Sequence, residues 1–92
     1  LQVSDNVDAF PIPAKDQIVI KYGLVSSSVV NLYILDSQGR KIKSLVSGVT
    51  QNGSQEVPWN LKTDAGSRVS PGTYFYTLEF GENTASGKVV VQ

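Results

Sequence analysis

The 92-residue sequence contains no cysteine, no histidine and no methionine. Without cysteine and histidine the chain cannot form a disulfide, has no thiolate nucleophile and lacks the two residues that most often bind zinc. Without methionine it also lacks an initiator residue, so we expect it to be a fragment or a processed product of a larger protein. With these kinds of chemistry excluded, the sequence is informative mainly about the fold.

The sequence has no excess of charge of either sign, since eight lysines and arginines balance eight aspartates and glutamates. Its densest basic stretch, Arg40-Lys41-Ile42-Lys43, is interpreted as the exposed face of one strand, because a phosphate-binding surface needs more cations than this. No apolar run approaches the roughly 20 residues of a membrane-spanning helix, and no apolar signal-peptide segment is visible. We therefore predict neither nucleic-acid binding nor membrane insertion.

The sequence does contain short strands separated by turn residues. The clearest strand follows Pro71-Gly72, where four large apolar residues alternate and must point to one face: Tyr74, Tyr76, Leu78 and Phe80. Further strands are predicted at residues 16–24, 29–35, 40–46, 55–59 and 84–91. No segment has a sustained helical period, and turn signals separate the strands. The pattern predicts an all-β antiparallel fold of about seven strands in two sheets, a sandwich rather than a closed barrel.

Turn residues and prolines set the expected boundaries. Asp36-Ser37-Gln38-Gly39 suits a type I turn that joins two neighbouring strands in a hairpin, and both Ser26-Ser27-Ser28 and Asn52-Gly53 are predicted to be turns. Residues 1–9 are predicted to be a lead-in or linker, and residues 10–92 a single domain. Phe10 and Ile12, each followed by proline, are expected to be extended and to tuck against a sheet edge.

Aromatic residues supply the candidate core and the candidate contact residues. Trp59, Tyr74, Tyr76 and Leu78 are predicted to form the structural core. Tyr33 and Phe75 lie on the opposite faces of their strands and are candidates for contact with a partner or ligand. Because aromatic faces stack on sugar rings, carbohydrate binding remains an open alternative.

Catalytic chemistry is not indicated. The carboxylates are scattered through turns and exposed strand positions, none in an apolar setting that would raise its pKa, and the serines have no histidine base. The loop with Asn60, Thr63 and Asp64 offers several oxygen ligands for calcium, but a tight turn is the preferred interpretation. We predict a non-enzymatic protein with no catalytic residue, no cofactor and no metal site.

An ordered set of motifs resembles a known family. The motifs are the opening Phe10-Pro11-Ile12-Pro13, the hairpin of residues 30–42, Trp59-Asn60, the stretch of residues 66–76 that ends in Tyr74-Phe75-Tyr76, and the closing Lys88-Val89-Val90-Val91. Together they resemble the bacterial FlgD-like immunoglobulin domain and are similar to the C-terminal sorting domains of type IX secretion cargo. The resemblance covers residues 10–92. One departure is Asn60-Leu61, which stands where the family has Asp-Gly after the tryptophan.

The resemblance implies an immunoglobulin-like sandwich that is the C-terminal module of a larger exported bacterial protein, located outside the cell or on its surface. Its expected role is structural, or that of a signal for secretion and surface attachment. The expected partner is a protein, either the secretion machinery or a neighbouring domain of the same chain. Two alternatives remain open: a carbohydrate-binding module of a secreted polysaccharide hydrolase, and a flagellar hook-cap domain.

Overall fold

A computed structural model describes residues 7–92, which form five strands in one antiparallel sheet. The strands are β1 (Asp8–Phe10), β2 (Ile18–Leu35), β3 (Lys41–Trp59), β4 (Gly72–Phe80) and β5 (Asn83–Val91). β2 pairs with β1, β3 and β4, and β4 pairs in turn with β5. The predicted all-β antiparallel architecture is confirmed.

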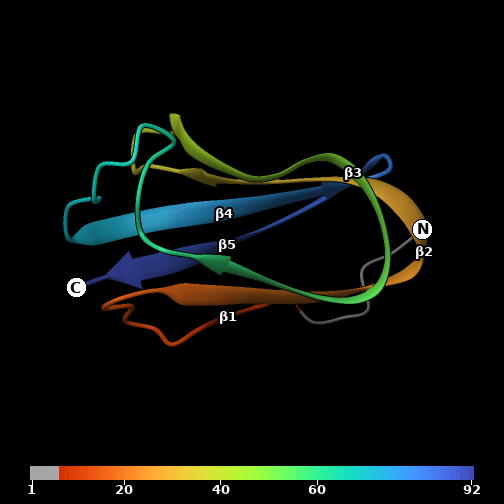
Figure 1. Cartoon of the computed structure of the whole chain (residues 1–92), viewed down its shortest axis with the longest axis horizontal. Helices are drawn as coiled ribbons and strands as arrows, with labels where there is room; N and C mark the ends of the chain where they lie inside the picture. Colours follow the sequence, from red (N-terminus) through yellow and green to blue (C-terminus); the bar gives the residue numbers. More distant parts are fainter. Residues whose placement is uncertain (1–6) are drawn as a thin grey trace.

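The sheet curls into two facing layers because β2 and β3 are long and bend (Figure 1). Residues 18–24 of β2 pair with β1 and with residues 53–59 of β3, which together make the first layer. Residues 28–35 of β2 pair with residues 41–51 of β3 and with β4, so the second layer runs β3–β2–β4–β5.

The expected count of seven strands is not found in the part of the chain that the structure describes. Residues 16–24 and 29–35, predicted as separate strands, belong largely to one strand, β2, and residues 40–46 and 55–59 likewise lie in β3. The reason is that the pairing between β2 and β3 continues on both sides of the bend.

A wide bulge produces this bend. Leu24 pairs with Gly53 and Ser28 pairs with Gln51, so three residues of β2 lie opposite Asn52 alone. Extra residues on one strand bend it and increase the local twist. Gly53, with φ of 75°, supplies a left-handed conformation on the other strand. The serines of residues 26–28 and the Asn52-Gly53 pair therefore bend the ribbon, and the prediction that they reverse the chain is wrong.

The core lies between the two layers. Its buried members are Ala14, Ile18, Ile20, Tyr22, Leu24, Val30, Leu32, Ile34, Trp59, Leu61, Val69, Tyr74, Tyr76, Leu78, Phe80, Val89 and Val91. The Trp59 ring of the first layer meets the Tyr74 ring of the second edge-on, with centroids 6.0 Å apart and planes at 72°. The Tyr74 hydroxyl donates to the Ser70 carbonyl at 2.6 Å, a bond like that of the tyrosine corner in immunoglobulin-type sandwiches.

The chain enters the sandwich along one edge. β1 begins at Asp8, inside the range predicted to be a lead-in or linker, and residues 1–6 lie outside the described residues. The side chains of Phe10 and Ile12 are 45% and 46% exposed, so they do not tuck against the sheet as expected. Ala14 takes that place: its side chain is buried, its N–H donates to the Val90 carbonyl, and its carbonyl accepts from Gln92.

A substitution at Leu61 can show whether the burial of its side chain outweighs the strain in its backbone. Its φ of 63° is left-handed, which costs a non-glycine residue about 1–2 kcal/mol, and it stands where the resembling family carries glycine. Its side chain is fully buried, and deleting a buried leucine side chain costs about 2–5 kcal/mol. We therefore expect Leu61→Gly to lower the free energy of unfolding measured with urea. An increase would show that the strain outweighs the burial.

A substitution at Gly87 can test its close contact with Tyr76 on the neighbouring strand. It lies opposite Tyr76 in the register, and a Cβ atom at this position would overlap the Oη and Cζ atoms of the Tyr76 ring. Overpacking of this kind costs about 1–3 kcal/mol, so Gly87→Ala should destabilise the domain, whereas the neighbouring exposed Ser86→Ala should not. In a Tyr76→Ala background the Gly87→Ala penalty should largely disappear; an undiminished penalty would exclude the ring as its cause.

Candidate functional site

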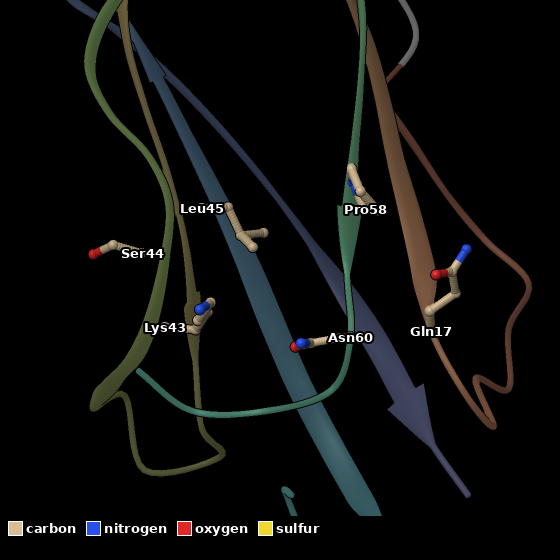
Figure 2. A pocket seen from close by; sticks show the side chains of 6 residues that line it. All are labelled: Gln17, Lys43, Ser44, Leu45, Pro58 and Asn60. Atoms are coloured by element: carbon tan, nitrogen blue, oxygen red, sulfur yellow. The ribbon is translucent and has the colours of Figure 1, made fainter. Parts of the chain in front are cut away.

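One candidate site is a cleft between the two halves of β3, with a volume of about 370 Å³ (Figure 2). It is lined by Gln17, Lys43, Ser44, Leu45, Pro58 and Asn60. Leu45 points from one half of β3 toward the other, while the Ser44 hydroxyl points outward. The cleft exists because β3 is the outermost strand of both layers, so its two halves face each other across an open side of the sandwich.

The loop after Trp59 closes one end of this open side. The Asp64 N–H donates to the Ile42 carbonyl at 3.0 Å, and the Asp64 carboxylate accepts from the Ser44 N–H at 3.2 Å. The Lys43 ammonium lies 3.7 Å from the same carboxylate. Trp59 anchors the loop, because its indole N–H donates to the Lys62 carbonyl at 2.9 Å. Asp64, considered above as a calcium ligand, thus caps the exposed edge of β3.

The cleft is lined by both polar and apolar side chains. Its lining contains one cation, two amides, one hydroxyl and two apolar side chains, and no carboxylate. Within residues 7–92 no group of three or more acidic residues is placed to hold a metal ion. None of the described residues forms a helix long and apolar enough to cross a membrane.

The second candidate site is the outer face of the second layer, which carries both predicted contact residues. Tyr33 lies opposite Thr77, and Phe75 lies opposite Leu35, two residues along the same two strands. Tyr33 is half-buried, while Phe75 is 36% exposed. The predicted core residues Trp59, Tyr74, Tyr76 and Leu78 all lie on the opposite, inner side, between 0% and 9% exposed.

Tyr33 is held by two polar neighbours. Its hydroxyl donates to the Glu79 carboxylate at 2.9 Å, and the Lys41 ammonium sits 4.2 Å from its ring centroid, a cation–π contact. The hydrogen bond to Glu79 is the main reason that the pKa of Tyr33 is raised, with burial and the negative charge of Glu79 adding to it. The ring face and the hydroxyl of Tyr33 are therefore already engaged within the domain.

Phe75 sits in a row that crosses all four strands of the second layer. We call this the Phe75 row; from β3 to β5 it consists of Lys41, Leu35, Phe75 and Lys88. The two lysines are exposed and Leu35 is half-buried. The row therefore presents an apolar centre between two positive charges.

Sequence reasoning identifies Phe75 but misses its neighbours in the row. The lysine on β5 could have been found, because the tight turn at Gly81 places Phe80 opposite Asn83, and the same register brings Phe75 to Lys88. Leu35 could not, because β2 and β4 are neighbours in the sheet but are separated in the sequence by β3, and no local pattern fixes their register.

Comparison with known proteins addresses the fold and the family. The family model described as secretion system C-terminal sorting domain matches residues 8–92. No curated protein matches the chain at a significant level.

Two solved structures from Porphyromonas gingivalis share the fold. Dimeric latent PorU has a TM-score of 0.76 and 21% identity over 99% of this chain. PorZ, an essential bacterial surface component of the type IX secretion system, has a TM-score of 0.69 and 24% identity over 96% of this chain. The present chain corresponds to only 9% of the PorU chain and 12% of the PorZ chain.

The contact between Tyr33 and Glu79 gives a testable titration. The raised pKa means that the folded domain favours neutral Tyr33, so this stabilisation is complete below the ordinary value of 10.0 and is lost as the pH rises through the folded-state pKa. Glu79→Gln should lower the pKa of Tyr33, measured by NMR of the ring carbon that bears the hydroxyl. Tyr33→Phe identifies the signal. An unchanged pKa in Glu79→Gln would contradict the assignment of Glu79 as the cause.

Proposed function

We propose that this chain, which belongs to the family of secretion system C-terminal sorting domains, directs a larger exported protein to the type IX secretion machinery. Domains of this family are non-catalytic regions of bacterial proteins that are released from the cell or attached to its surface. One observation carries the proposal: the family model spans the sandwich from the first residue of β1 to the end of the chain.

The proposed mechanism is recognition of the folded domain by a protein of the machinery. A sandwich offers a partner two kinds of surface, exposed strand edges and the outer faces of its sheets. In this domain one edge of β3 is partly capped by Asp64, whereas the Phe75 row on the outer face of the second layer is open. Tyr33 and Phe75 are the residues that we assign to contact with the partner, Tyr33 as a supporting residue because its hydroxyl and ring face are engaged.

The family match favours this sorting role over the two alternatives. The FlgD-like branch of the resemblance, and with it a hook-cap role, is not supported by that match. A carbohydrate-binding module presents a platform of exposed aromatic rings. Trp59, Tyr74 and Tyr76 are buried here, and Tyr33 is covered by Lys41.

A secretion reporter tests the proposed function. Residues 1–92, fused to the C-terminus of a periplasmic reporter protein, should cause its export in a host with an active type IX system. The same fusion in a host without that system, and the reporter alone, should remain in the periplasm. Retention of the complete fusion in the competent host would refute the proposal.

A variant of the same fusion separates the folded surface from a linear signal. Leu78 is fully buried, so Leu78→Asp places an unpaired charge in the core and should unfold the domain. Export should then fail. Export at the original level would show that a linear sequence is recognised, and the mechanism proposed here would be wrong.

A further inference from the structure

The outer face of the second layer differs from an ordinary solvated face. Polar side chains usually cover the outer face of a sandwich, alternating with the core residues of each strand. Here apolar side chains lie beside Phe75 on the neighbouring strands: Leu35 is opposite it on β2, and the half-buried Val90 lies on β5, two residues from Lys88. Thr73 and Thr77 flank Phe75 on its own strand. Phe75 is a large aromatic side chain at the centre of this region and is left 36% exposed.

Positive charge flanks this apolar centre on both sides. Lys41 and Lys88 occupy the two ends of the Phe75 row, three strand spacings apart, which corresponds to roughly 14 Å between their backbones. The Lys41 ammonium lies over the Tyr33 ring, 4.2 Å from its centroid, and keeps its positive charge there. Asp36, at the end of β2, is already paired with Arg40 at 2.8 Å. Glu79 lies four residues further along β4 than Phe75 and accepts a hydrogen bond from the Tyr33 hydroxyl. No carboxylate therefore balances the two lysines within the row.

We propose that the Phe75 row is a docking surface for a protein that inserts an apolar side chain between two carboxylates. The partner's apolar side chain would pack on Phe75 and Leu35, and its carboxylates would pair with Lys41 and Lys88. A few side chains near the centre of an interface contribute most of its binding energy, and aromatic residues are frequent there, while charges at its rim set orientation and association rate. This inference rests on the proposed function, because it specifies the surface that the secretion machinery would recognise.

A protein fits this surface better than a glycan or a membrane. A glycan needs a free aromatic face with hydrogen-bonding side chains around it, but Lys41 covers the ring of Tyr33 and the Phe75 row holds only apolar and cationic side chains. Each lysine near the surface of an anionic membrane contributes only about 1 kcal/mol to the binding free energy of the protein. Two lysines at opposite ends of the row therefore provide little membrane attraction.

The export reporter tests the surface with matched variants. Phe75→Ser and the double variant Lys41→Glu/Lys88→Glu should each reduce export at least tenfold. The controls are Val25→Ser, which removes another exposed apolar side chain, and Lys62→Glu, which reverses another exposed lysine; both should export normally. A thermal melt of each purified variant must match the wild type, so that any loss of export is assigned to the surface.

The outcomes separate the two proposals. If the wild-type fusion is not exported, the proposed function fails. If the wild type is exported and the Phe75 and lysine variants are exported equally well, the sorting role stands and the docking surface is wrong. Export that is lost in Phe75→Ser but unaffected by the double charge reversal would also overturn the proposal, because the partner then has no carboxylates at the two ends of the row.

A photo-crosslinker tests the chemistry of the partner directly. With p-benzoylphenylalanine in place of Phe75, irradiation of living cells should yield a protein adduct whose crosslinked residue is apolar. Aspartates or glutamates should surround that residue in the partner, and changing them to lysine should restore export of Lys41→Glu/Lys88→Glu. An adduct with a glycan, with lipid or with a basic protein segment, or no adduct at all, would refute the proposal.

Discussion

The pairing of β2 with β3 through the bend is the constraint on which the rest of the structure depends. One antiparallel ribbon contributes a pair of strands to each layer, so the two layers are connected by the backbones of β2 and β3, which pair on both sides of the bulge. The bulge opposite Asn52 decides where the ribbon folds back. Once the ribbon folds back, the two halves of β2 contribute to the same core, for example through Ile20 and Leu32. β4 and β5 then complete the second layer, and Trp59 meets Tyr74 across the interior.

The same bend leaves β3 as the outermost strand of both layers, and exposed strand edges invite pairing with other chains. The domain covers part of this edge with the loop after Trp59, where the Asp64 backbone and side chain bond to Ile42 and Ser44. The buried Leu61 holds that loop in place, because its carbonyl accepts from the Val69 N–H. The strained backbone conformation of Leu61 thus helps to hold the loop that covers the edge of β3.

Features fixed by neighbouring residues could be predicted from the sequence, and features fixed by distant pairing could not. The Asp36 turn was predictable because the Asp36 carboxylate accepts N–H bonds from Arg40 and Gln38, and the bond from Arg40 is the main cause of its lowered pKa. The alternation of β4 was predictable because Tyr74 and Tyr76 follow a Pro-Gly turn. A bulge and a turn use the same small polar residues, so Ser28 gave no sign of which would form.

The residues that carry the family resemblance mostly determine the fold. Tyr74 and Tyr76 face the core, Val69 is buried, and Gly39 has the left-handed φ of 84° that its turn requires. A match to these positions therefore establishes the shape of the domain without locating the surface that a partner reads. That surface must be sought among side chains that the core does not need. On the outer face Phe75 is such a side chain, because it is 36% exposed and lies outside the core.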